Sequence, residues 1–152
     1  MSWLPDDFQH PELVELPTGQ HLRPIRASDA EIDLPAVMGS RDRLFSIYGE
    51  AWGGWPPAAM TLEQDRDDLA HHEREIAAHE SFNYALLDAA EAELLGCVYI
   101  DPPRDPDVDG EAAVSWWVVD ALVGSPVERA LDDLVPRWLA DSWPFERWRV
   151  GV

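Results

Sequence analysis

The sequence predicts an α/β fold in which a mixed, mostly antiparallel sheet is flanked by helices. Residues 61–80 show helical periodicity behind an N-cap, and residues 82–102 indicate two adjacent strands joined by a turn. Around them, strand-like and helix-like segments follow the order β-α-α-β-β-β-α-β. A chain of 152 residues can bury one sizeable core, so we expect one domain.

The N-terminal segment, residues 1–20, is expected to be an arm. Three prolines and scattered apolar residues favour irregular structure there, with at most one short strand. The domain then covers residues 21–152 and opens with a strand in "HLRPIRASDA". Ser28 and Glu31 have the spacing of a capping box, which predicts the start of the first helix.

Helices are expected on both sides of a glycine-rich loop. Residues 30–50 are apolar at helical spacing but are interrupted at Pro35 and Gly39, so they form one broken helix or two short ones. The loop is "GEAWGGWPPAAM". Thr61 caps the next helix, and Gln64 completes its capping box.

The second half of the chain supplies most of the sheet. "FNYALLDAAEAELLGCVYIDPP" predicts a hairpin, and "AAVSWWVVD" predicts the strand after it. "SPVERALDDLVPRWLADSW" predicts a helix loosened at Pro136, and "PFERWRVGV" a last short strand.

Composition narrows the partners. Thirty acidic against eleven basic side chains give a formal charge of -19, which repels phosphate backbones and argues against nucleic acid. The acidity either serves solubility alone or attracts amines, polyamines and basic protein surfaces. Cys97 is the lone cysteine, and no signal peptide or membrane span is visible, so we expect a cytoplasmic protein.

With "LRPIRASDAE" at its start and "LLGCVYI" before "VSWWVVD", the chain resembles the GCN5-related N-acetyltransferase (GNAT) superfamily over residues 21–150. The resemblance implies acyl-CoA-dependent transfer to an amine, with acetyl-CoA as the cofactor. It also implies that one strand, here Val114 to Val119, offers its backbone to the pantetheine arm at Val118 and Val119. The following loop would take the pyrophosphate on amide groups at Val123, Gly124, Ser125 and Val127.

That loop departs from the GNAT pattern Q/R-x-x-G-x-G/A. Aligning Ala130-Leu131 with the family's small-Leu pair places Val123, Pro126 and Glu128 at the three defining positions. Ser125 and Glu128 instead form a capping box, in which the Glu128 carboxylate is expected to reach the Ser125 N–H and repel a diphosphate. The alternative is a shift of one or two residues that leaves Gly124 as a phosphate contact.

The sequence stops at Val152, before the helix and two strands that the resemblance implies, so the last strands are expected to be absent. The segment "ERWRV" would then be a sheet edge that pairs with a second copy, is covered by the arm, or is protected by Arg147 and Arg149. We favour the homodimer, partly because eight tryptophans are many to bury.

Candidate site residues lie on two segments. Glu111 precedes the strand 114–119 and is the candidate general base, unless it is simply a solvated acid. The loop between the first helices brings aromatic rings and one acid, which either form a box for a cationic amine or close the core: Tyr48, Glu50, Trp52, Trp55.

His71, Glu75 and His79 share a helical spacing, but without further ligands they favour a solvated face, and no metal is expected. Two functions follow from these observations. One is an N-acetyltransferase-like protein with an unknown amine acceptor, whose activity the altered loop puts in question. The other is a non-catalytic protein that holds a cationic small molecule or a basic partner.

Overall fold

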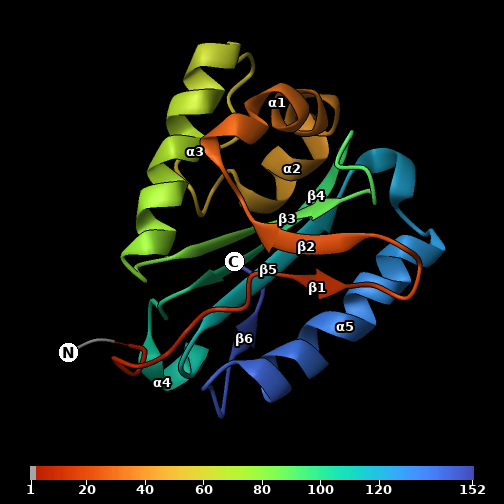
Figure 1. The fold of residues 1–152 in the computed structure, drawn as a ribbon. Coiled ribbons are helices and arrows are strands. Elements are labelled where there is room, and N and C mark those ends of the chain that lie inside the picture. Colours follow the sequence, from red (N-terminus) through yellow and green to blue (C-terminus); the bar gives the residue numbers. More distant parts are fainter. Residues whose placement is uncertain (1–2) are drawn as a thin grey trace.

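One mixed sheet runs through the protein, and the computed structural model describes it over residues 3–152 (Figure 1). Its six strands in these residues lie in chain order, β1-β2-β3-β4-β5-β6. The neighbours are antiparallel except β5 and β6, which are parallel. The strand bounds are Val14–Glu15, His21–Pro24, Phe82–Leu87, Leu94–Asp101, Ala113–Val118 and Arg149–Val150. The predicted fold class is therefore confirmed.

The helices follow the expected order. They are α1 (Ala30–Gly39), α2 (Arg41–Tyr48), α3 (Leu62–Ala77), α4 (Pro106–Asp109) and α5 (Pro126–Ser142). The broken region thus forms two short helices, and the short α4 lies between β4 and β5. Every helix in residues 3–152 is too short or too polar to cross a lipid bilayer.

The capping box of α3 is confirmed, whereas the one expected at the first helix is not. Thr61 accepts from the Gln64 N–H at 3.1 Å, and the Gln64 side chain accepts from the Thr61 N–H at 2.9 Å. At the first helix, a 3-10 turn (Ala27–Asp29) precedes α1, and Asp29 rather than Ser28 accepts a backbone N–H, that of Arg26. Buried Arg23 holds Asp29 in place through two hydrogen bonds of 2.8 and 2.9 Å.

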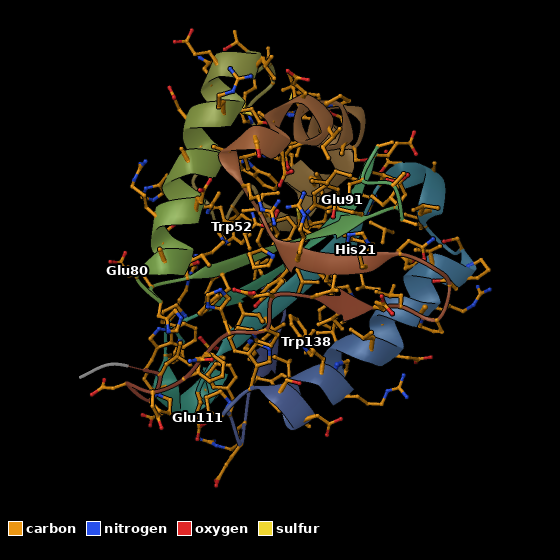
Figure 2. All side chains as sticks on the ribbon, in the orientation of Figure 1. His21, Trp52, Glu80, Glu91, Glu111 and Trp138 are labelled. Carbon is orange, nitrogen blue, oxygen red and sulfur yellow. The ribbon has the colours of Figure 1, made fainter. Side chains whose placement is uncertain are left out.

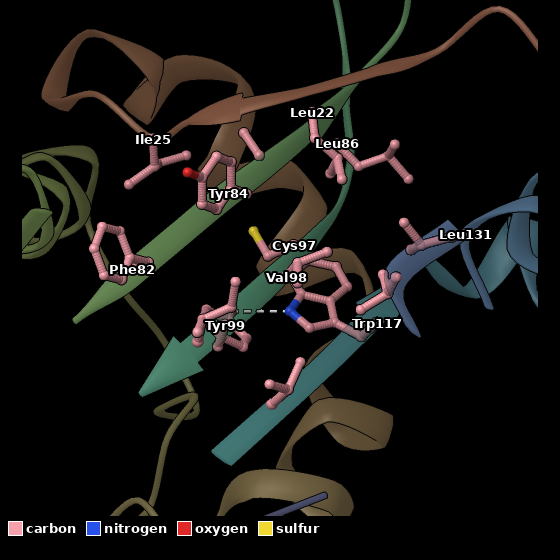
Figure 3. Packing of buried hydrophobic residues seen from close by; sticks show 14 of the residues in the cluster. Leu22, Ile25, Phe82, Tyr84, Leu86, Cys97, Val98, Tyr99, Trp117 and Leu131 are labelled. Atoms are coloured by element: carbon pink, nitrogen blue, oxygen red, sulfur yellow. Dashed lines mark hydrogen bonds between the residues drawn. The ribbon is translucent and has the colours of Figure 1, made fainter. Parts of the chain in front are cut away.

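The sheet has two different faces because side chains alternate along each strand. Phe82, Tyr84 and Leu86 face α5, where the rings of Tyr84 and Trp138 meet edge to face at 4.9 Å. The residues that alternate with these along β3 point to the opposite face. That face lies toward α1 and α3, which Figure 1 shows on the other side of the sheet from α5. The core is closely packed across these layers, and within it the Trp117 indole donates to the Tyr99 hydroxyl at 2.9 Å (Figure 3).

The N-terminal segment lies along the domain. β1 pairs with β2, the Trp3 indole donates to the His79 carbonyl at 2.9 Å, and the Tyr84 hydroxyl donates to the Pro11 carbonyl at 2.6 Å. Trp3 stacks on Phe145 with ring centroids 5.5 Å apart. All eight tryptophans belong to the core or pack against it, so their number no longer argues for the predicted homodimer.

The α5 face predicts one stability measurement. Leu139 is fully buried, so Leu139→Ala should lower the free energy of unfolding by about 2–5 kcal/mol in urea titrations, through lost burial and a residual cavity. Leu13, 59% exposed, is the control, and Leu13→Ala should change it by less than about 0.5 kcal/mol. Equal effects of the two substitutions would contradict this packing.

Candidate functional site

A cavity of about 690 Å³ lies between the sheet and the helices α1 and α3. Its floor is formed by alternate residues of three strands, which point to the same face: Asn83, Tyr99, Asp101, Ala113, Ser115. Its walls come from α1, α3, the loops around residues 52–55 and 102–109, and the C-terminal residues 149–152. This is a volume typical of small-molecule sites.

The cavity reaches the place where β5 and β6 separate. The two strands pair only at Ala113 with Arg149 and at Val114 with Val150, and the Gly151 N–H donates to the Val114 carbonyl at 2.8 Å. Beyond that point, residues 115–118 of β5 have no β6 partner in the described chain. Ser115 and Gly151 both line the cavity, so it ends at this opening in the sheet.

Acidic side chains dominate the cavity walls. Seven carboxylates line it: Asp33, Asp65, Asp68, Glu75, Asp101, Asp105, Asp109. Two arginines, Arg104 and Arg149, and one histidine, His72, also line it. The arginines are already engaged, Arg149 with Asp109 at 2.8 Å and Arg104 with the Ala51 carbonyl at 2.7 Å. The cavity therefore presents a negative potential that favours cations.

Two of these carboxyl groups face each other. Asp33 and Asp65 are 3% and 1% exposed, and a hydrogen bond joins their side chains. Burial, together with the neighbouring Asp65, raises the pKa of Asp33 well above its ordinary value. Asp33 therefore keeps the proton and donates it in a hydrogen bond to the Asp65 carboxylate. The sequence offers no sign of this pair, because the two residues lie on different helices.

His72 and Asp101 carry altered acidities further along the cavity. Burial alone would lower the pKa of His72, but the Asp68, Glu75 and Asp101 carboxylates outweigh it and raise that pKa. Burial raises the pKa of Asp101, although its hydrogen bond from the Ser81 hydroxyl opposes this. Both groups can therefore exchange protons closer to neutral pH than an exposed carboxylate does.

The aromatic residues expected around the loop are brought together. The Tyr48 ring stacks on Trp52 at 4.2 Å, and Trp52 and Trp55 lie 5.5 Å apart. The two tryptophans line the cavity (Figure 2 labels Trp52), whereas Tyr48 is fully buried behind them. Tyr48 thus closes the core and the tryptophans form a wall of the cavity, while their role as a box for a cationic amine stays a prediction.

Tyr99 belongs to this aromatic cluster, and sequence reasoning missed it. Its ring meets Trp52 edge to face at 4.8 Å. Its place on the same face as Asp101 was readable from the strand alternation. Glu50, by contrast, is exposed and does not line the cavity.

Glu111 lies outside the cavity. Its carboxylate accepts from the Glu146 N–H at 3.0 Å, and its own N–H donates to the Arg147 carbonyl at 2.9 Å. Figure 2 shows it well apart from Trp52. In this position it ties the segment before β6 to the segment before β5.

Most of the amide groups at the start of α5 already have acceptors. The Glu128 N–H donates to the Ser125 hydroxyl at 3.3 Å, as the capping box predicts. The Glu128 carboxylate, however, accepts from the Gly124 N–H at 2.9 Å rather than from Ser125. The Ser125 N–H donates to the Leu122 carbonyl because a 3-10 turn (Asp120–Leu122) precedes the helix. The predicted partner of Glu128 was therefore wrong by one residue.

Gly124 keeps an open side at this loop. It has a φ of 78°, which favours glycine, and a Cβ placed there would meet no atom within 4 Å. Arg129 donates to its carbonyl at 2.8 Å and brings a positive charge to the loop. Val123 is 51% exposed, and Val127 packs against the core.

The end of β5 is also occupied by the protein itself. Arg43 donates to the Val118 carbonyl and, through Nε, to Asp120 at 2.6 Å. The Asp120 N–H donates to the Ser40 hydroxyl at 2.9 Å, and the Val119 N–H donates to Leu95. Residues at the junction of α1 and α2 thus cover the backbone that the resemblance assigns to pantetheine.

His79 does not join the two histidines of α3, which both contact Glu75. His71 is within 3.4 Å of Glu75, but His79 lies beyond the helix end and contacts the His10 ring at 3.0 Å. In residues 3–152, no three His, Cys, Asp or Glu side chains are grouped closely enough to hold a metal ion. Cys97 is buried in β4, which raises the pKa of its thiol.

These features define a protein with the GNAT acetyltransferase fold. Solved structures with this fold include the ribosomal-protein-S5-alanine acetyltransferase from Vibrio fischeri, which is 19% identical with a TM-score of 0.62, over 85% of this chain and 67% of that one. A GNAT-family acetyltransferase from Bordetella pertussis is 18% identical with a TM-score of 0.56, over 92% and 77%.

A third similar structure is the microcin C7 self-immunity acetyltransferase MccE, in complex with acetyl-CoA and AMP. It is 12% identical with a TM-score of 0.63, over 84% of this chain and 67% of that one. No family model and no curated protein matches the sequence. The resemblance read from the sequence is therefore confirmed for the fold.

The Asp33–Asp65 pair predicts a pH-dependent stability. The raised pKa of Asp33 means that wild-type stability falls as pH rises above the unfolded value near 4, because only the folded state keeps the proton. An amide at residue 33 would donate to Asp65 at every pH. Asp33→Asn should therefore raise the free energy of unfolding at pH 7 by at least about 1 kcal/mol, and by much less at pH 4.

Urea titrations at the two pH values measure this effect. Asp67, exposed on α3 and outside the cavity, is the matched control, and Asp67→Asn should show no such pH dependence. A pH-independent gain in Asp33→Asn would contradict the shared proton.

Proposed function

We propose that this protein is an acyl-CoA-dependent N-acyltransferase whose acceptor is a small cationic amine. The observation that carries the proposal is the acidic, aromatic-walled cavity that ends where β5 and β6 separate. The fold supplies the second argument, because similar structures are named as acetyltransferases and some contain CoA or acetyl-CoA. Trp52, Trp55 and Tyr99 suit the hydrophobic part of such an amine and its charge.

The cavity also suggests how an amine would lose its proton before attack. Asp101 lines the floor beside Ala113, and its raised pKa makes it a stronger base than an exposed carboxylate. Glu111 is the base that the sequence favoured, but it would reach the cavity only after leaving the Glu146 N–H. We therefore assign the proton-accepting role to Asp101.

The coenzyme side requires displacement of the protein's own groups. The coenzyme contacts would be those that the resemblance implies: Val118, Val119, Val123, Gly124, Ser125, Val127. Gly124 is open and Arg129 is near, which favours a diphosphate at the positive end of the α5 dipole. Glu128 must release the Gly124 N–H, and Arg43 must release the Val118 carbonyl.

One specific observation favours the non-catalytic alternative. The N–H groups of residues 123, 124, 125, 128 and 129 all have acceptors within the chain. If these bonds are not released, the coenzyme cannot bind at this loop, and the cavity would hold a cation without any acyl transfer. Affinity for acetyl-CoA separates the two functions.

Titration calorimetry with acetyl-CoA tests the proposal. The wild type should bind acetyl-CoA, and Glu128→Ala should bind it about tenfold more tightly. Removing the carboxylate frees an amide donor and removes a repulsion of about 1 kcal/mol or more. Asp133, exposed on α5 one turn further along, is the control, and Asp133→Ala should bind like the wild type. The absence of binding by all three proteins would reject the enzyme in favour of the cation binder.

A further inference from the structure

Two buried polar groups on the cavity lack a donor. Asp65 Oδ2 and Asn83 Oδ1 receive no hydrogen bond from any N–H or hydroxyl group in residues 3–152, and both residues line the cavity. They are 1% and 5% exposed. A buried acceptor left unpaired costs about 1–3 kcal/mol, so a bound donor would be favoured there.

Apart from the proton that Asp33 shares with the Asp65 carboxyl group, residues 3–152 supply no donor to these two atoms. The charged groups that face Asp33 and Asp65 are Asp29 before α1, and Asp68 and His72 on α3. Cys97 beneath them on β4 stays a thiol, since burial raises its pKa. Arg104 and Arg149 line the cavity but bond elsewhere. The surroundings of the two acceptors are thus mostly acidic, and a primary ammonium offers three donors and the opposite charge.

We propose that Asp33, Asp65 and Asn83 form an ammonium-binding subsite that takes one end of a diamine or polyamine. On binding, the ammonium takes the place of the proton between the two carboxyl groups, and that proton passes to the solvent. The exchange is balanced, because a neutral carboxylic acid becomes a carboxylate and one H⁺ leaves.

The shape of the cavity indicates more than one ammonium group. Asp65 and Glu75 both line it and stand ten residues apart on α3, which corresponds to about 15 Å along the helix. Asp101 lies near Glu75, and its strand partner Ala113 stands two residues before Ser115, where the opening between β5 and β6 begins. An acidic group therefore stands at each end of the cavity, a distance that an extended polyamine spans.

This inference rests on the proposed function for the choice of the reacting nitrogen. The ammonium at Asp65 stays charged and cannot attack an acyl group. The nitrogen that reacts would be the second one, near Asp101 and the opening in the sheet. Binding of the first nitrogen, however, needs no coenzyme.

Calorimetry with spermidine, in the absence of coenzyme, tests the subsite. At pH 7 and about 0.15 M salt, titrations in buffers of different ionisation enthalpy should show release of up to about one proton on binding to the wild type. Asp33→Asn should abolish the release, because residue 33 then has no proton to give up. Asp65→Asn should weaken binding by about tenfold or more.

The controls separate this subsite from the general negative charge. Asp67→Asn should bind spermidine like the wild type, and the monoamine butylamine should bind more weakly. Spermidine binding that is absent, or that is equal in all variants with no proton release, overturns the inference. The proposed function would then still stand if acetyl-CoA binds. Conversely, spermidine binding with proton release but no acetyl-CoA binding would support the subsite and reject the enzyme.

Discussion

The short parallel ladder between β5 and β6 is the constraint on which the site depends. Its pairing stops at Val114 and Val150, although β5 continues to Val118. A longer ladder would close the sheet at this point. Because it ends early, the floor of the cavity reaches an opening between two strands, where the coenzyme and the amine of the proposed enzyme would meet.

The two layers of helices divide the work between the faces. α5 covers an apolar face with Leu131, Val135 and Leu139, all fully buried. On the other face, α1 and α3 cover a sheet surface that includes Asn83, Asp101 and Ser115, and their own acids point at it. The face under α1 and α3 thus also holds a carboxylic acid pair and unpaired acceptors that cost folding free energy. Such a cost is expected where a ligand binds.

On the proposed coenzyme side, the protein's own side chains hold backbone groups that a coenzyme would need. Glu128 and Arg43 hold the Gly124 N–H and the Val118 carbonyl, and both side chains can rotate away without breaking a strand. In the proposed enzyme, a diphosphate and its arm would have to displace these contacts in order to bind. The altered loop is therefore as consistent with a weakened coenzyme site as with a lost one.

The sequence predicted what local patterns determine. The strand order, the Thr61 cap and the place of Trp52 and Trp55 follow from periodicity and turn chemistry. Arg43, Asp33 and Asp65 were missed because their partners are remote in the chain: Val118 is 75 residues from Arg43. The predicted hydrogen-bond partner of Glu128 was wrong by one residue. The Ser125 N–H donates instead to the Leu122 carbonyl of a 3-10 turn, which no simple sequence pattern marks.

A crystal structure grown with acetyl-CoA tests the central claim most directly, namely that the opening between β5 and β6 and the acidic cavity form one site. We predict that the thioester lies between Ser115 and Gly151 at the end of the cavity, with Glu128 and Arg43 rotated away from Gly124 and Val118. A structure at saturating coenzyme in which Arg43 still contacts the Val118 carbonyl, and the coenzyme is absent from the opening, would contradict it.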